Sequence, residues 1–289
     1  MILSSIKRAL VNLIQRAGHR GPVSLQKATT DMTLGIDLIP PDHLILKNGI
    51  GAGDRKNIGT EFQDIGAGLI GEMIRDDCIL PDHRVFDVGC GLGRLARALT
   101  QYLSPTGVYF GIDVTKSSID WCTANYPGYP NFHFIHADVF NTEYNPTAVR
   151  LAADYRFPFE ANSFDFIFST SLYTHLVLRD ADNYLSEMAR VLNPEGRMWN
   201  TFLLLDEISE PLARTAHTEV RMPFEIEGGL TAIPHNPEAL ISFRRPVIEG
   251  IHTRHGLQIE DIRNGTWSGR SDNLRASYQD VVIARKITP

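Results

Sequence analysis

The stretch that most constrains the fold is residues 84–97, R-V-F-D-V-G-C-G-L-G-R-L-A-R. An apolar run is followed by glycines at positions 89, 91 and 93 and then by a helical pattern. The apolar run predicts a buried strand, and the alternating glycines predict a turn with a bare backbone. Because the first N–H groups of a helix are unpaired and point outward, a ligand can approach such a turn closely. The sequence therefore predicts a ligand site between a strand and a helix.

From residue 84 onward, strand and helix patterns alternate, which predicts an α/β fold with a doubly wound, mainly parallel seven-stranded sheet. A turn is expected at residues 193–196, N-P-E-G. The expected strands are 85–88, 108–112, 132–136, 166–169, 197–205, 257–262 and 280–284, and the expected helices are 64–74, 92–103, 117–125, 181–192 and 247–255.

The 289 residues divide into three expected parts. Residues 1–25 read as a basic amphipathic helix, residues 26–80 as an extension rich in turn formers, and residues 81–289 as the main domain. Within the main domain, residues 206–245 interrupt the alternation with prolines and a Gly-Gly pair, so we expect an insertion that caps the carboxyl edge of the sheet.

The amino-terminal helix has an apolar face and basic residues around it, with no acidic residue before Asp31. Such a helix can lie on an anionic membrane surface through residues 1–20, serve as a mitochondrial presequence, or dock on the domain or on a partner. The apolar face carries Ile2, Ile6, Leu10 and Leu13, and the basic residues are Lys7, Arg8, Arg16 and Arg20.

Composition excludes several classes of function. The net charge of −6 and the lack of any concentration of Lys and Arg in the main domain argue against a nucleic-acid partner. The cysteines at 78, 90 and 122 have neither disulfide nor zinc-ligand spacing, which indicates a reducing, cytoplasmic environment. No apolar stretch reaches the ~18 residues of a membrane span.

Acidic residues mark the ends of the next two strands. Asp113 lies 20 residues after Gly93, at the distance where a carboxylate accepts hydrogen bonds from a ribose diol. Asp138 ends the third strand, where a side chain can reach an adenine edge. The glycine turn and these two strand ends together predict a slot for an adenosine-containing ligand.

The glycine spacing separates two candidate cofactors. A dinucleotide fingerprint reads G-x-G-x-x-G, but here Arg94 stands where its third glycine would be. Asp87, two residues before the loop, suits a ligand with an ammonium group and opposes a pyrophosphate. These residues favour S-adenosylmethionine over NAD.

Four segments in register resemble the class I S-adenosylmethionine-dependent methyltransferases, especially bacterial small-molecule members. They read D-V-G-C-G-L-G, G-I-D-V, H-A-D-V and S-F-D-F-I-F, and A-R-V-L-N-P-E-G-R follows them. The resemblance covers residues 81–205 firmly and the tail more weakly. It implies that residues 81–289 form a methyltransferase domain.

The resemblance also implies a role for each matching position. Asp87 and the loop residues Gly89, Cys90, Gly91 and Gly93 would bind the methionine part, with Arg94 near its carboxylate. The remaining positions are Asp113 at the ribose hydroxyls, Val114 beside the adenine, Asp138 at the adenine amino group, Val139 as an apolar or backbone contact, and Ser169 and Thr170 near the sulfonium.

Methyl transfer from a sulfonium is an in-line displacement, which depends mainly on positioning and on exclusion of water. The segment S-T-S-L-Y-T-H-L after the fourth strand offers His175 as a base or orienting group, and Tyr173 as a second candidate. The Asn/Asp-Pro-Pro-aromatic tetrapeptide of many amine methyltransferases is missing there, which favours an oxygen acceptor.

Other charged residues carry weaker expectations. His252 and His255 have near-ligand spacing, but no second pair of ligands is evident, so no metal site is expected. Arg244, Arg245 and Arg270 either meet an anionic acceptor, such as a phosphorylated sugar or a lipid-linked glycan, or are solvated surface charges.

We therefore expect an S-adenosylmethionine-dependent enzyme that O-methylates a small-molecule or glycan-type acceptor, with S-adenosylhomocysteine as its product. Residues 141–157, 206–245 and the extension would enclose the acceptor. Two alternatives remain open at this point: an NAD(P)-dependent oxidoreductase, and a non-catalytic nucleotide-binding scaffold at a membrane surface.

Overall fold

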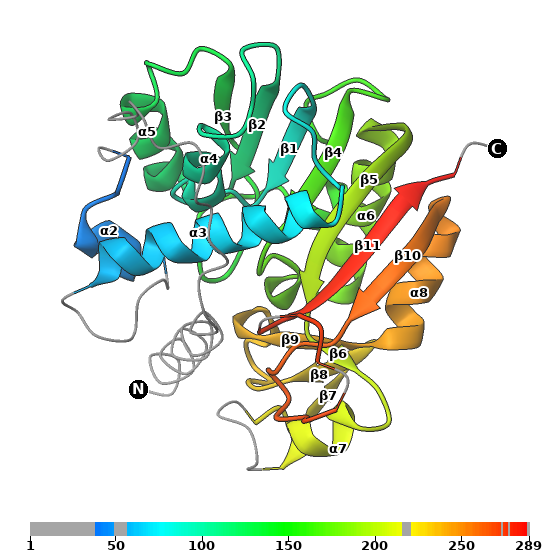
Figure 1. Ribbon diagram of the computed structural model, residues 1–289. Coiled ribbons are helices and arrows are strands. Elements are labelled where there is room, and N and C mark those ends of the chain that lie inside the picture. The colour runs from blue at the N-terminus through cyan, green and yellow to red at the C-terminus, as the bar shows by residue number, and fades with distance from the viewer. Residues whose placement is uncertain (1–37, 49–56, 216–220, 273, 277, 288–289) are drawn as a thin grey trace.

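The computed structural model describes residues 38–48, 57–215, 221–272, 274–276 and 278–287 (Figure 1). The amphipathic helix expected over residues 1–25 lies outside the described residues. No helix in the described ranges is long and apolar enough to cross a membrane.

The main sheet has seven strands in the order β10-β11-β5-β4-β1-β2-β3, as predicted for a doubly wound fold. Neighbouring strands pair in parallel except around β11, which is antiparallel to both β5 and β10. The strands are β1 Arg84–Val88, β2 Val108–Asp113, β3 Phe132–His136, β4 Phe164–Ser169, β5 Leu192–Phe202, β10 Leu257–Arg263 and β11 Asp280–Lys286.

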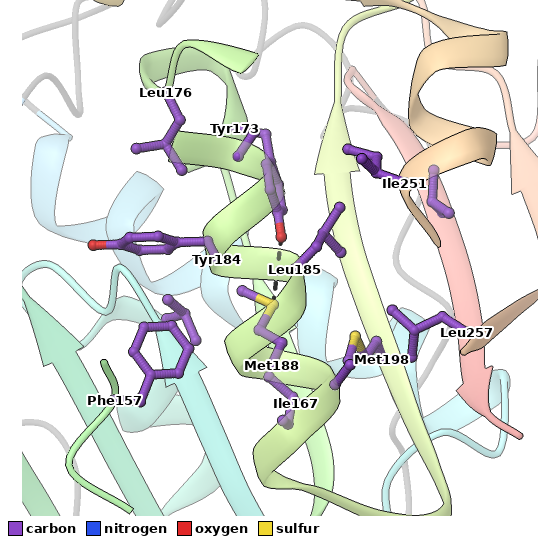
Figure 2. Packing of buried hydrophobic residues seen from close by; sticks show 14 of the residues in the cluster. Phe157, Ile167, Tyr173, Leu176, Tyr184, Leu185, Met188, Met198, Ile251 and Leu257 are labelled. Atoms are coloured by element: carbon purple, nitrogen blue, oxygen red, sulfur yellow. Dashed lines mark hydrogen bonds between the residues drawn. The ribbon is translucent and has the colours of Figure 1, made fainter. Parts of the chain in front are cut away.

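Helices cover both faces of this sheet, because its strands are buried on both sides. On β1, Val85 packs with the cluster that contains α3, α4 and α5 residues, whereas Phe86 packs with the α6 and α8 cluster. Figure 2 shows the second cluster, in which Met188 of α6 lies among side chains from the strands and from α8. The helices are α2 Asp42–Lys47, α3 Ile58–Arg75, α4 Arg94–Leu99, α5 Lys116–Asn125, α6 Leu178–Val191, α7 Ser209–Arg214 and α8 Arg245–Arg254, with short 3-10 turns η1 Ala152–Asp154, η2 Tyr173–His175 and η3 Pro237–Ala239.

A second, four-stranded sheet lies beyond the carboxyl end of β5 (Figure 1). It occupies the segment in which the sequence predicted an insertion, and we call residues 204–244 the cap. The strand order is β6-β9-β8-β7, with β6 Leu204–Leu205, β7 Phe224–Ile226, β8 Gly229–Thr231 and β9 Ile241–Arg244.

One local prediction was wrong. Residues 193–196, expected as a turn, belong to the long strand β5. The backbone is irregular there, since Glu195 has a φ of 62° and the register between β4 and β5 shifts between Phe164 and Phe166. The turn-forming residues therefore make a bulge inside a strand, a way in which a sheet accommodates such a sequence.

Candidate active site

A cavity of about 210 Å³ opens at the carboxyl ends of β1, β2 and β4. Its walls come from the glycine turn, the end of β2, the segment after β3, the turn after β4, and single positions on α3, α6 and η3. This is the edge of an open α/β sheet at which ligands bind.

The glycine turn has the backbone that only glycine adopts without strain. Gly89, Gly91 and Gly93 have φ values of 85°, 52° and 73°, all in the left-handed region. A Cβ on Gly91 would meet no described heavy atom within 4 Å, so the main chain there is open to a ligand. A Cβ on Gly93 would lie 3.1 Å from the Tyr126 hydroxyl and 3.2 Å from Cys122 Sγ. Gly91 therefore faces the cavity, whereas Gly93 is required by packing.

The N–H groups of this turn bond within the protein. Those of Gly89 and Cys90 both donate to the carbonyl oxygen of Ile112, at 2.9 Å each. The Gly91 N–H donates to Asp113 Oδ2 at 2.8 Å. These N–H groups therefore fix the turn to β2, and its contribution to binding is close approach of the backbone.

Two opposite charges line the same part of the cavity. Asp87 is 1% exposed, and its Oδ2 accepts a hydrogen bond from the Tyr109 hydroxyl at 2.8 Å. Burial raises the pKa of Asp87 to about 7, although the Tyr109 bond opposes the rise. Burial lowers the pKa of Arg94 to about 10, and Asp87 opposes that shift. Among the described residues, the side chain of Arg94 makes no hydrogen bond or ion pair. A carboxyl and a guanidinium together fit the ammonium and carboxylate of an amino acid.

Asp113 lies at the other side of the turn, at the end of β2. Its Oδ1 accepts the Thr115 N–H at 2.7 Å and its Oδ2 accepts the Gly91 N–H. Burial raises the pKa of Asp113, and these backbone bonds oppose the rise. A carboxylate has about four acceptor sites, so lone pairs remain for a diol. Val114 and Val139 line the cavity beside it.

The comparisons with known proteins agree with this geometry. Residues 86–200 match the family model described as a methyltransferase domain. This match includes the carboxyl-terminal part of β1, the glycine turn, the ends of β2 and β4, and α6.

Residues 86–200, the part of the chain that the family model matches, form a methyltransferase domain.

Curated methyltransferases also match this chain. The chain is 32% identical over 153 residues to the uncharacterized methyltransferase YcgJ of Bacillus subtilis, which is 52% of this chain and 49% of that protein. The matched part spans only 29% to 49% of the length of such curated relatives.

Solved structures share the fold. One is a SAM-dependent methyltransferase of Methanosarcina mazei, with a TM-score of 0.52, 18% identity, and coverage of 75% of this chain and 98% of that one. Another is the magnesium protoporphyrin IX methyltransferase of Synechocystis with bound SAM, with a TM-score of 0.50, 15% identity, and coverage of 85% and 90%.

Several residues predicted for the methyltransferase site lie elsewhere. Asp138 is exposed and accepts a hydrogen bond from Asn145 Nδ2 at 3.0 Å, outside the cavity lining. Ser169 is buried and donates to Asn200 Oδ1 at 2.8 Å, and its neighbour Thr170 lines the cavity instead. Of the predicted cofactor residues, the structure therefore brings together Asp87, Gly89, Cys90, Gly91, Arg94, Asp113, Val114, Val139 and Thr170.

Tyr173 requires a correction. Its side chain is fully buried in the core, where it stacks on Phe202 and its hydroxyl donates to Met188 Sδ at 3.4 Å (Figure 2). Burial raises the pKa of this phenol well above its usual value. The structure does not support the catalytic role that the sequence suggested for Tyr173, which is a packing residue.

His175, on the same 3-10 turn, lines the cavity. Its Nδ1 lies 2.8 Å from the backbone carbonyl oxygen of Glu238 in the cap. Because a carbonyl oxygen only accepts hydrogen bonds, Nδ1 carries the proton, and the lone pair of the neutral ring is on Nε2. The methyltransferase domain thus holds an imidazole in a defined tautomer at its cavity.

Glu238 also connects the cap to the segment after β3. Its carboxylate Oε2 accepts the Thr142 N–H at 2.9 Å and a short hydrogen bond from the Thr142 hydroxyl. Asn236 Nδ2 donates to Glu143 Oε1 at 3.3 Å. The η3 turn of the cap is therefore fastened over the cavity at which His175 lies.

Sequence reasoning missed most of the wall on this side. The notable additions are aromatic, from the irregular segment after β3 and from α6. The only signal in the sequence was the unusual length of that segment, which gives no direction for its side chains. The missed lining residues include Phe140, Leu172, Leu176 and Tyr184. In the segments that were expected to enclose the acceptor, the lining side chains that the sequence did not single out are Asn48, Ile65, Asn141, Tyr144, Ala152 and Ala239.

Proposed function

We propose that this chain transfers a methyl group from S-adenosylmethionine to an oxygen atom of a small-molecule or glycan-type acceptor. The observation that carries the proposal is the single cavity wall that joins the glycine turn, the Asp87 and Arg94 pair, Asp113 and His175. The missing Asn/Asp-Pro-Pro-aromatic tetrapeptide supports oxygen rather than an amine nitrogen.

The residues present fit the cofactor. Gly91 leaves space for close approach, and Asp87 and Arg94 suit the ammonium and carboxylate of the methionine part. Asp113 would accept from the ribose hydroxyls, and Val114 and Val139 would contact the adenine. An ammonium group beside Asp87 would favour its ionised form and offset the effect of burial.

When bound, S-adenosylmethionine supplies a methyl group on a sulfonium. An acceptor oxygen can attack the methyl carbon in line and displace the thioether. The chain would hold the acceptor in the cavity and exclude water through the cap. His175 would take the acceptor's hydroxyl proton on Nε2, while the Glu238 carbonyl keeps the other ring proton in place.

Isothermal titration with S-adenosylhomocysteine tests the cofactor part. We expect binding to the wild type and a loss of at least tenfold in affinity for Asp113→Ala, with no change for Asp120→Ala, whose carboxylate pairs with Lys116 at the surface. NADH serves as the competing ligand. Binding of NADH without binding of S-adenosylhomocysteine would refute the proposal and favour an oxidoreductase.

His175 is tested once turnover is observed. His175→Gln should lower kcat and remove the limb of the pH–rate profile that reports the base. His235→Gln is the matched control, because His235 is exposed in the cap. An unchanged profile in His175→Gln would remove His175 from the mechanism.

A further inference from the structure

The charged and the uncharged side chains of the cavity lining come from different segments of the chain. The charged side chains of its lining are Asp87, Arg94 and Asp113, all at the glycine turn and the end of β2. The cofactor proposed above accounts for each of them. The uncharged part of the lining is therefore left for the acceptor.

We call this uncharged part of the lining the acceptor compartment. It is formed by the segment after β3, the turn after β4, α6 and η3, and its side chains are aromatic or aliphatic apart from Asn141, His175 and the two hydroxyl residues Thr170 and Ser171. The residues that define it are Phe140, Tyr144, Leu172, Leu176, Tyr184 and Ala239.

The side chains of Asn141, Ser171 and His175 already bond within the protein. Asn141 Oδ1 accepts the N–H groups of Glu143 and Tyr144, each at 3.0 Å, and its Nδ2 donates to the His175 carbonyl oxygen at 3.4 Å. The Tyr144 ring lies edge to face against His175, with the ring centroids 5.4 Å apart. These contacts shape the wall rather than offering a row of hydrogen-bond partners for a sugar.

Two of the arginines that the sequence suggested for binding an anionic acceptor form ion pairs with acidic residues outside the cavity. Arg244 pairs with Glu210 and Glu225, both at 2.9 Å. Arg270 is 7% exposed and pairs with Asp206 at 2.8 Å. Neither lines the cavity.

A phosphate or sulfonate in the compartment would lose its hydration without gaining a cation, which disfavours its binding. A flat apolar molecule would gain by burial and by contact with the aromatic rings.

Resting on the function proposed above, we propose that the acceptor is an uncharged aromatic hydroxyl compound, not a phosphorylated sugar or a glycan. In the transfer, the methyl carbon–sulfur bond breaks and its electron pair stays on sulfur. The phenolic oxygen forms the new bond to the methyl carbon, and its proton passes to His175 Nε2. The products are an aryl methyl ether and S-adenosylhomocysteine.

The test uses the full chain saturated with S-adenosylhomocysteine and three probes: 1-naphthol, a naphthol sulfonate and N-acetylglucosamine. We expect 1-naphthol to bind at least tenfold more tightly than either other probe in isothermal titration. With S-adenosylmethionine in place of the product, we expect methylation of 1-naphthol in preference to the others.

A charge variant checks that binding occurs in this compartment. Ala239→Lys places a cation at a wall residue that is 8% exposed, and should weaken 1-naphthol at least tenfold while narrowing the preference over the sulfonate. Val149→Lys is the control, because Val149 is 94% exposed and outside the cavity lining. Both variants should bind S-adenosylhomocysteine like the wild type, which shows that they fold.

The outcomes separate the two proposals. Failure of S-adenosylhomocysteine to bind refutes the methyltransferase proposal, and the acceptor class falls with it. If the product binds but 1-naphthol does not bind, or the sulfonate or the sugar binds more tightly, the acceptor class is wrong. An Ala239→Lys variant that binds 1-naphthol like Val149→Lys would also overturn it.

Discussion

Two glycines of the same turn should respond differently to one added methyl group. Gly91 and Gly93 both have a left-handed backbone, so alanine at either position costs about 1–2 kcal/mol of folding free energy. They differ in what the new Cβ would meet. At Gly91 no described heavy atom lies within 4 Å, whereas at Gly93 Tyr126 and Cys122 lie within 3.2 Å.

The magnitudes follow from these surroundings. Gly91→Ala should lower the free energy of unfolding by about 1–2 kcal/mol from backbone strain alone. Gly93→Ala adds overpacking of about 1–3 kcal/mol, for a total of roughly 2–5 kcal/mol. For the ligand the order reverses, because the Gly91 methyl would occupy space at the cavity. A comparable steric penalty of about 1–3 kcal/mol corresponds to a loss of roughly 5- to 150-fold in affinity.

The assay measures both quantities on both variants. Urea unfolding gives the change in stability, and isothermal titration with S-adenosylhomocysteine gives the change in affinity at a temperature where both variants are folded. The reasoning predicts that Gly91→Ala is the weaker binder and Gly93→Ala is the less stable protein. Equal affinity for Gly91→Ala and wild type would refute the placement of a ligand against this turn.

Three further predictions concern other parts of the fold. Burial lowers the pKa of His252 to about 4, so its stabilising contribution is full above pH 6.5 and is lost as the pH falls towards 4. In urea titrations, the free energy of unfolding of the wild type should fall by about 3 kcal/mol more than that of His252→Leu between pH 7 and pH 4. The same pH dependence of unfolding free energy in both proteins would contradict this. Asp280 is 1% exposed, and its carboxylate accepts hydrogen bonds from three N–H groups. In Asp280→Asn the side-chain NH₂ must face at least one of these donors, so the free energy of unfolding should fall by about 1–3 kcal/mol. A change below about 0.5 kcal/mol would show that this hydrogen-bond network is dispensable. Glu238→Ala should reduce kcat/KM for the acceptor about tenfold, because it loses both hydrogen bonds with Thr142. The affinity for S-adenosylhomocysteine should stay unchanged. A loss confined to cofactor affinity would contradict this separation of the acceptor site from the cofactor site.

The cofactor half of the site was predictable because its signals are local. The apolar strand, the turn and the helix that follow one another in residues 84–99 place Asp87, Gly91 and Arg94 by their own periodicity. Asp113 follows from the same rule, since parallel strands end at one edge of the sheet.

The incorrect placements of Tyr173 and Asp138 had local causes. Tyr173 and His175 are two positions apart on a 3-10 turn, and successive residues of such a turn are rotated by about 120°. Their side chains therefore leave the turn in different directions, and one of them had to point away from the cavity. Asp138 precedes Val139, which is buried in the cavity wall, and Asn145 binds the aspartate on the outer side. The direction of the Tyr173 side chain could have been predicted from the geometry of the turn. The position of the Asp138 side chain depends on its contact with Asn145 across the loop.

The acceptor half depends on contacts between distant segments. Glu238 bonds to Thr142 across 96 residues and to His175 across 63 residues, and no periodicity predicts either contact. Because the two halves are built differently, they should also vary independently. Changes in the cap alter which molecule fits beside His175. The hydrogen bonds that hold Asp113 come from Gly91 and Thr115, which do not belong to the cap. A cap substitution that impairs use of the acceptor should therefore leave cofactor affinity as it was. This separation is measured by kcat/KM for the acceptor and by S-adenosylhomocysteine affinity in Glu238→Ala.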